Sequence, residues 1–105
     1  AMDIPFIIIE GRRVEPAEPK MKVWREFLKQ SEYDIAKQTM DEFISSQVKL
    51  IVLAFGKPEI VNEETLDEHL NVSDVVPLVR KLFNWIQLLT FEKLSKAPNA
   101  EAGKA

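Results

Sequence analysis

The residues best suited to chemistry lie between positions 64 and 69, where the single histidine follows three carboxylates. His69 comes after Glu64, Asp67 and Glu68, and all four side chains are of types that can ligate a metal ion. A site with one imidazole requires carboxylates held at fixed geometry by further hydrogen bonds. The helix dipole explains acidic residues at the start of a short helix more simply. We therefore expect a solvated helix here and no metal site.

Neighbouring carboxylates also occur at Asp41-Glu42 and Glu63-Glu64, and enzymes use carboxylates in pairs for acid–base catalysis. Residues adjacent on a helix do not face each other across a substrate. The chain contains no cysteine, and its sequence has no glycine-rich phosphate loop and no nucleophile–base arrangement. The sequence thus predicts a protein that is not an enzyme, with no catalytic residues, no cofactor and no metal.

Composition and charge restrict the class of partner further. The 105 residues are 46% hydrophobic and 30% charged, enough for one ordered domain with its own core. A net charge of −3 offers no basic surface to nucleic acid or to an anionic membrane. The longest apolar runs, such as Leu50 to Phe55, are too short to span a bilayer. Ala1 has the form of a cloning remnant before a natural start at Met2, and no secretory leader is evident, so we expect a cytosolic protein.

One long helix, predicted from 73 to 94, organises the chain. Ser73 suits the N-terminal cap, Asp74 suits the helix dipole, and Pro77 is expected within the first turn. At about 100° per residue, the apolar residues of this helix cover a very broad face. That is more apolar surface than one small core needs, so we expect part of it to contact another protein. The side chains expected to bind this partner are Phe83, Trp85, Leu88 and Phe91.

The N-terminal segment predicts a small β-hairpin or an extended arm. Ile4 to Ile9 is β-branched and aromatic, Glu10-Gly11 is a turn signal, and Arg12 to Glu15 can return as a second strand. An isolated hairpin is marginally stable in water. We therefore expect the hairpin to lie on the helices or to add to the sheet edge of a neighbouring subunit. The residues expected to mediate self-association are Ile7, Ile8 and Ile9.

The whole chain predicts a mainly α fold, in which the hairpin or arm is followed by a bundle of three to four helices. The prolines of the linker close an N-terminal part at 1–18, a helical domain covers 19–94, and a tail without large apolar residues, 95–105, is expected to be disordered. The expected helices cover about 19–30, 32–55, 64–70 and 73–94.

Local signals predict where these helices begin, end and face the core. A capping box from Ser31 is expected to begin the second helix, Gly56 to end it, and Asn62 or Thr65 to cap the third. Leu50 to Phe55 should be central in the core or in an interface, with a strand from Lys49 to Phe55 as the alternative. The other side chains expected to face inward are Met21, Trp24, Phe27, Leu28, Met40, Phe43, Ile44, Ile60 and Val61.

By their order and spacing, these segments resemble the tail assembly chaperones of long-tailed (siphovirus-type) bacteriophages and prophages, especially those of Gram-positive hosts. The resemblance lies in a hairpin IIIEGRRVEP, then PKMKVWREFLK, then an acidic amphipathic helix that ends VLAFG. The segment ETLDEHLNVSDVVPLVRKLFNWI follows, and it is similar to that family's short helix leading into a longer one. The resemblance covers roughly Ile7 to Leu94, most of the chain.

The resemblance implies a protein that binds the long, helical, apolar tape measure protein before the tail tube closes around it. Such chaperones keep the tape measure protein soluble, help to recruit tail tube protein, act in the host bacterial cytoplasm and are absent from the mature virion. Many copies coat one client, so a homo-oligomer is expected. A small helical adaptor or regulator with another client is the alternative. A DNA-associated regulator is disfavoured by the acidic charge and by the lack of a basic recognition helix.

Overall fold

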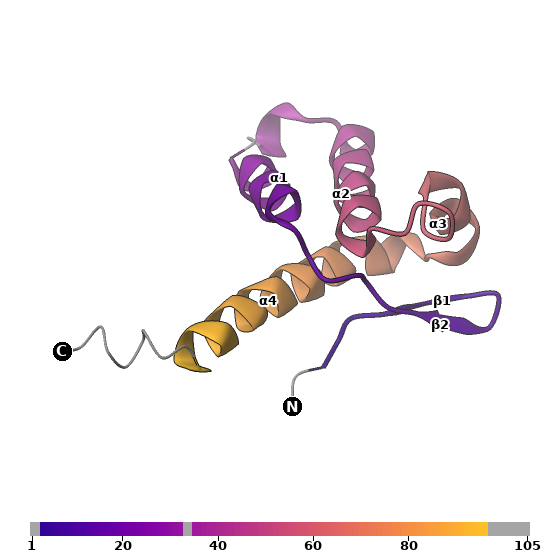
Figure 1. Cartoon of the computed structure of the whole chain (residues 1–105). Coiled ribbons are helices and arrows are strands. Elements are labelled where there is room, and N and C mark those ends of the chain that lie inside the picture. Colours follow the sequence, from indigo (N-terminus) through magenta and orange to yellow (C-terminus); the bar gives the residue numbers. More distant parts are fainter. Residues whose placement is uncertain (1–2, 33–34, 97–105) are drawn as a thin grey trace.

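The structure is a computed structural model that describes residues 3–32 and 35–96 (Figure 1). It is mainly helical, with a two-stranded antiparallel hairpin at the N-terminus, and so confirms the predicted fold class. α2 packs on α1, α3 and α4, and α4 passes beneath the other helices in the view of Figure 1. The elements are β1 (Ile7–Ile9), β2 (Arg12–Val14), α1 (Met21–Ser31), the 3-10 helix η1 (Ile35–Lys37), α2 (Met40–Phe55), α3 (Glu63–His69) and α4 (Val72–Lys96).

The hairpin turns through Glu10 and Gly11, as the sequence predicts. Both residues have positive φ angles, 52° and 76°, which is the backbone of a type I′ turn. The twist of this turn matches the right-handed twist of paired strands, so a two-residue connection is enough. Ile9 and Arg12 close the turn, and the register continues with Ile8 opposite Arg13.

Two prolines explain why each strand is only three residues long. Hydrogen-bonded and non-bonded pairs alternate along an antiparallel ladder. The pair that closes the turn, Ile9 and Arg12, is bonded, so the next bonded pair is Ile7 opposite Val14. Continuing this register places Pro5 opposite Pro16 at the next bonded position. Neither proline has an N–H group to donate, so the ladder ends there.

The hairpin packs on the helices of its own chain, which was the first of the two expectations for it. Ile7, Ile9 and Val14 are buried in the same hydrophobic core as the helices. The core therefore runs across the expected boundary between the N-terminal part and the helical domain.

α2 begins at Met40, so the expected start at residue 32 was wrong. Thr39 forms the capping box: its Oγ1 accepts from the Glu42 N–H at 3.1 Å, and Glu42 Oε1 accepts from the Thr39 N–H at 2.8 Å. The first residue after this cap, Met40, is 75% exposed and not inward-facing. The capping box predicted from Ser31 includes residues 33–34, which lie outside the described residues.

The apolar end of α2 forms the centre of the core, as expected, and it is helical rather than a strand. Leu50, Ile51, Ala54 and Phe55 are buried. Gly56 ends the helix in the left-handed conformation with φ 63°, which favours glycine. The linker after the hairpin crosses this helix end, where the Ala17 N–H donates to the Phe55 carbonyl oxygen at 2.9 Å.

The inward face of α1 differs from the prediction. Val23 and Phe27 are buried and Trp24 is half-buried, whereas Met21 and Leu28 are 61% and 41% exposed. At about 100° per residue, Met21 and Leu28 lie roughly 140–160° around the helix from Val23. The face that contacts α2 is therefore centred on Val23 and Phe27, so Met21 and Leu28 cannot reach it.

Asn62 caps α3 as predicted, through a capping box with Thr65. Of the pair before it that was expected to face inward, Val61 is fully buried but Ile60 is 44% exposed. After α3, the chain turns into α4 through Leu70, whose extended backbone (φ −103°, ψ 125°) requires no glycine.

α4 begins at Val72 and not at Ser73, and it ends two residues beyond the predicted 94. Pro77 is consequently the sixth helical residue, inside the helix rather than within its first turn. The remainder of the expected tail, 97–105, lies outside the described residues. None of the helices in the described ranges combines the length and the hydropathy that a membrane span requires.

Candidate functional site

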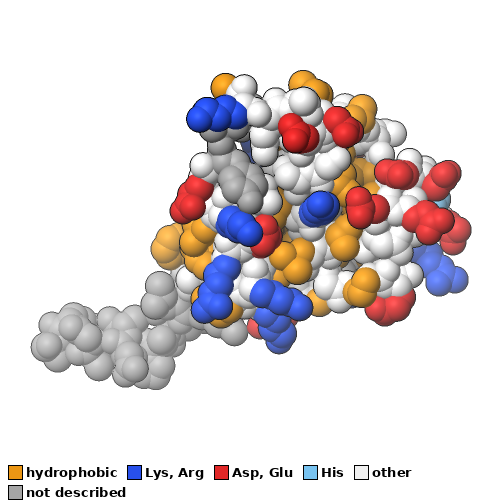
Figure 2. All heavy atoms as spheres, turned by 90° about the horizontal axis from the view of Figure 1, so that it is seen from above, with side chains coloured by type: hydrophobic (Ala, Val, Ile, Leu, Met, Phe, Trp, Pro, Cys, Tyr) orange, Lys and Arg blue, Asp and Glu red, His pale blue; other side chains and the backbone are white. Residues whose placement is uncertain are grey.

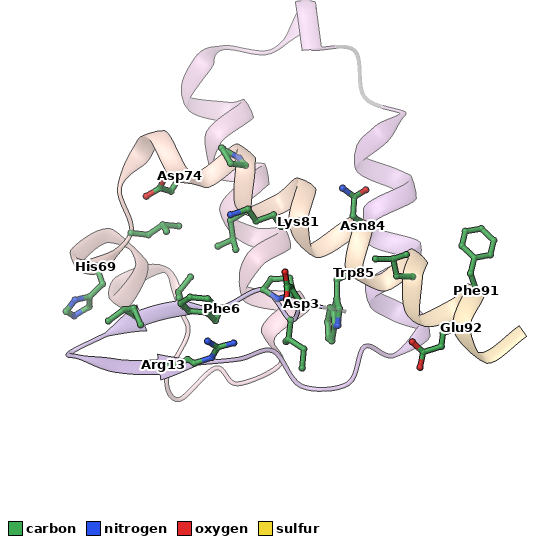
Figure 3. Close-up of a pocket in the computed structure, with 18 residues that line it drawn as sticks. Asp3, Phe6, Arg13, His69, Asp74, Lys81, Asn84, Trp85, Phe91 and Glu92 are labelled. Atoms are coloured by element: carbon green, nitrogen blue, oxygen red, sulfur yellow. The ribbon is translucent and has the colours of Figure 1, made fainter. Parts of the chain in front are cut away.

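A groove of about 1350 Å³ runs between the N-terminal segment and α4, and we call it the hairpin–α4 groove (Figure 3). In Figure 3, His69 lies at the end of the groove near the hairpin turn, and Phe91 lies at the opposite end. Large apolar side chains line both sides of the groove. On the hairpin side they are Ile4, Phe6 and Ile8, and on the α4 side they are Leu78, Trp85, Leu88 and Phe91.

The exposed side chains on the hairpin side of the groove come from alternate residues of the N-terminal segment. Ile4, Phe6 and Ile8 are 37%, 44% and 50% exposed, whereas the residues between them point into the core. A strand with one solvated face normally carries polar residues on that face. Here both faces are apolar, which is the pattern of a strand covered on both sides.

Arg13 of β2 holds the aromatic ring of Phe6 in place. Its Cζ lies 4.0 Å from the centroid of the Phe6 ring, and its Nε donates to Glu15 Oε2 at 2.9 Å. The guanidinium thus combines a cation–π contact with an ion pair on the exposed side of the hairpin. Both contacts restrict the orientation of the Phe6 ring beside the groove.

The α4 side has a buried floor and an exposed end. Leu78 and Trp85 line the groove but are only 6% exposed each, so they pack mainly against the core. Leu88 and Phe91, one and two turns further along, are 51% and 63% exposed. Of the four residues predicted to bind a partner, these two therefore have most of their surface available.

Phe83, the fourth predicted partner-binding residue, lies away from the groove. Its ring stacks on Trp24 and Phe27 of α1, with centroid distances of 5.6 Å and 5.5 Å. Phe83 and Trp85 are two residues apart, which corresponds to about 200° around a helix, so they point in nearly opposite directions. The sequence prediction placed them together, and the structure separates them.

The three isoleucines predicted to mediate self-association also divide between two faces. Ile7 and Ile9 are each 7% exposed and belong to the core of their own chain. Ile7 and Ile8 both line the groove, but only Ile8 exposes its side chain there. The structure therefore brings one exposed residue of the predicted self-association set into the same site as three predicted partner-binding residues.

Polar residues of both charges are distributed along the groove. Asp3, Asp74 and Glu92 contribute carboxylates, while Arg13 and Lys81 contribute cations. His69 is exposed at the end formed by α3. Within 3–32 and 35–96, no three histidine, cysteine or acidic side chains are grouped so as to hold a metal ion.

A smaller hollow of about 250 Å³ lies between α1, α2 and α4. Phe27, Phe43 and Phe83 line it together with serine and glutamine side chains. Its hydroxyls bond within their own helices, since Ser31 Oγ donates to the Leu28 carbonyl and Ser46 Oγ donates to the Phe43 carbonyl, each at 2.7 Å. This bonding pattern is that of helix surface residues and not of a nucleophile beside a base.

Sequence reasoning missed Ile4, Phe6, Leu78 and Lys81 as residues of one site. The signal for Ile4 and Phe6 was present, because a strand exposes every second residue. Applied to the N-terminal segment, this period groups Ile8 with Ile4 and Phe6 and separates it from Ile7 and Ile9. No local signal indicated that α4 would lie beside this strand.

No protein-family model, curated protein or solved structure matches this chain.

Proposed function

We propose that this protein binds an apolar segment of another protein in the hairpin–α4 groove and keeps that segment soluble. We further propose, from the resemblance of its segments, that it is a tail assembly chaperone and that its client is the tape measure protein. In this role it acts in the host cytoplasm, helps to recruit tail tube protein and is absent from the mature virion. It requires no cofactor and catalyses no reaction.

One observation carries the proposal: large apolar side chains are exposed on both sides of a single groove. Ile4, Phe6 and Ile8 face it from one side, and Leu88 and Phe91 extend it from the other. Contiguous apolar surfaces of this kind mark protein interaction sites more often than scattered apolar residues do. The aromatic rings in the groove are of the type that anchors protein–protein contacts.

The groove suits an apolar client because its charged groups are few and of both signs. Asp3, Asp74 and Glu92 line the groove with Lys81 and with Arg13, which already pairs with Glu15, so the carboxylates outnumber the cations slightly. A groove of this composition does not attract polyanions. Binding would depend mainly on burial of apolar surface, and so would tolerate many segments of one long client.

The test is co-production of this protein with segments of a tape measure protein. The fraction of the client segment that stays soluble is measured, together with the affinity of this protein for the segment. Leu88→Lys should weaken binding by at least about tenfold, because a charge would be buried at the contact. Leu28→Lys is the matched control, since Leu28 is a similarly exposed leucine on α1 outside the groove. Equal loss in both variants, or none in either, would refute the groove as the binding site.

A further inference from the structure

We propose that the segment held in the hairpin–α4 groove is an extended strand that pairs with the free edge of β1. This inference rests on the proposed function and specifies how the client is bound: the part of the tape measure protein in the groove would be extended while it is held, although the protein as a whole is expected to be helical. The client segment would lie between β1 and α4, with backbone hydrogen bonds on one side and side-chain contacts on the other. It would also carry basic residues at the end that lies beside α3.

The free edge of β1 follows from the register of the hairpin. Ile8 is opposite Arg13, a non-hydrogen-bonded pair, so the N–H and C=O groups of Ile8 point away from β2. Phe6, two residues earlier, has the same orientation. Within the described part of the chain, the backbone groups of Phe6 and Ile8 form no hydrogen bond with any other segment. An added strand would satisfy the outward groups of both residues at once.

This edge borders the groove, and the opposite edge does not. Residues 3–8 all line the groove, regardless of whether their side chains point inward or outward. Such a continuous run is expected where a backbone edge faces the groove, because one face of a strand would contribute only alternate residues. From β2, only Arg13 reaches the groove.

The two edges also differ in protection against strand addition. On the β2 side, Arg13 and Glu15 are charged, and Pro16 follows immediately. Charges and prolines are the usual means of protecting an exposed edge. On the β1 side, the outward residues Ile4 and Phe6 are apolar, and Pro5 has its missing N–H on the side that faces β2. The edge beside the groove is therefore the unprotected one.

The position of α4 fits strand addition as well. A strand added to β1 would present alternate side chains to the buried floor formed by Leu78 and Trp85. A groove between a sheet edge and a helix is a recurrent way of binding extended peptides, in which backbone bonds give affinity and side-chain pockets give selectivity. A third strand would also extend a two-stranded sheet, which is marginally stable by itself.

Charge complementarity sets the chemistry of one end of the occupant. Glu63, Glu64, Asp67 and Glu68 are exposed on α3 next to this end of the groove, outside its lining. In Figure 2, which views the molecule from above, acidic side chains gather at the α3 end with basic side chains beside them. Asp74 continues the negative charge into the groove. Lysine or arginine residues beside the apolar stretch would therefore be attracted to the end next to α3.

Hydrogen exchange of individual backbone amides, followed by NMR, tests this mode of binding. The probe is a synthetic peptide of alternating valine and threonine with lysines at one end, added to the full chain. The amides of Phe6 and Ile8 should exchange at least about tenfold more slowly when the peptide is bound, because they become hydrogen-bonded. The amides of Arg13 and Glu15, on the opposite edge, should exchange at unchanged rates. A peptide with glutamates in place of the lysines should bind more weakly.

A proline substitution provides an independent test with a matched control. Ile8→Pro removes the outward N–H group of β1 together with the side chain, whereas Ile8→Ala removes the side chain and keeps the N–H group. Peptide binding should be lost in Ile8→Pro but only weakened in Ile8→Ala. The exchange rates of the Ile9 and Arg12 amides, which bond each other across the hairpin, are measured in the same spectra. Slow exchange of these amides shows that the hairpin is intact in each variant.

Three outcomes would overturn the inference, and only one of them also removes the proposed function. If the peptide or a tape measure segment binds while the Phe6 and Ile8 amides exchange as before, the client is held by side chains and the strand mode is wrong. If the glutamate peptide binds as tightly as the lysine peptide, the basic end is wrong. If no apolar segment binds at all, the groove is not a client site and the proposed function fails with it.

Discussion

At the scale of single residues, exposure separates the side chains that hold the fold from those that are available to a partner. Trp85 and Phe91 both line the hairpin–α4 groove, but they are 6% and 63% exposed. Phe83 is half-buried between Trp24 and Phe27 and packs against α1. Substitutions at these positions should therefore affect stability and binding in different proportions.

Trp85→Ala should lower the free energy of unfolding by about 3–5 kcal/mol, because a large buried side chain would be removed without a replacement. Phe91→Ala should change it by no more than about 0.5 kcal/mol, since the ring is mostly exposed. Urea titrations of the two variants, followed by circular dichroism, measure the difference. Equal losses of stability would mean that Phe91 packs as tightly as Trp85.

Gly56 illustrates backbone strain at one position. Its φ of 63° is unfavourable for residues with a Cβ, while the nearest atom to such a Cβ would be the Ala17 Cβ at 3.5 Å, an ordinary contact. Gly56→Ala should therefore cost about 1–2 kcal/mol through the backbone alone. Gly56→Asn should cost less, because asparagine adopts this conformation more readily. Thermal unfolding of both variants decides whether strain or crowding dominates at this helix end.

At the scale of elements, short-range caps determine where the helices begin. Thr39 and Glu42 bond each other's backbone at the start of α2, and Asn62 and Thr65 do the same at α3. Ser73 was expected to act in the same way for α4, but it is the second residue of that helix. Thr39 and Ser73 therefore have different roles, although both carry the sequence signal of an N-terminal cap.

Thr39→Ala should destabilise the protein by about 1 kcal/mol, because the Glu42 N–H at the start of α2 loses the Thr39 hydroxyl that accepts its hydrogen bond. Ser73→Ala is the comparison, and it should lie within about 0.5 kcal/mol of the unsubstituted protein. Chemical denaturation of both variants under the same conditions gives the two values. A larger effect at Ser73 would indicate that Ser73 caps α4 and that the helix begins at Asp74, two residues later than in the structure.

At the scale of the whole molecule, the hairpin is part of the fold and one side of the site. Ile7, Ile9 and Val14 complete the core, while Ile8 on the same strand faces the groove. An arm used only for self-association would carry its apolar residues away from its own helices. The hairpin instead uses one face for stability and the other for the groove.

Removal of residues 3–16 should therefore abolish cooperative unfolding or lower the melting temperature strongly, because three core residues are lost and their contacts become exposed. Ile8→Lys should leave the melting temperature nearly unchanged, since this side chain is outward-facing. Thermal circular dichroism of the two proteins distinguishes these outcomes. If the shortened chain melts like the full chain, the hairpin is a dispensable arm.

The exposed face of β1 that lines the groove is also the candidate surface for self-association. Many copies on one client were expected, and Ile8 is the residue of the predicted self-association set that is available for such a contact. If copies associate through this face, Ile8→Lys should reduce the mass measured by light scattering while the chain stays folded. Unchanged mass would place any self-association elsewhere.

Local chemistry in the sequence was enough to predict the mainly helical fold, the Glu10-Gly11 turn, the Gly56 helix end and the Asn62 cap. Each of these depends on a few neighbouring residues whose backbone preferences and hydrogen bonds act over one turn. The apolar end of α2 was also predictable, because no face of it is polar.

Tertiary packing alone decided which apolar side chains are buried and where the groove lies. Phe83 and Trp85 are equally apolar in sequence, yet one contacts α1 and the other lies on the floor of the groove. Met21 and Leu28 were expected inside and are exposed, because α1 turns a different face toward α2. Periodicity shows that a helix has an apolar face, but the neighbouring element determines which part of that face is covered. The groove joins residues from the N-terminal segment and from α4, and their proximity depends on how the whole chain folds.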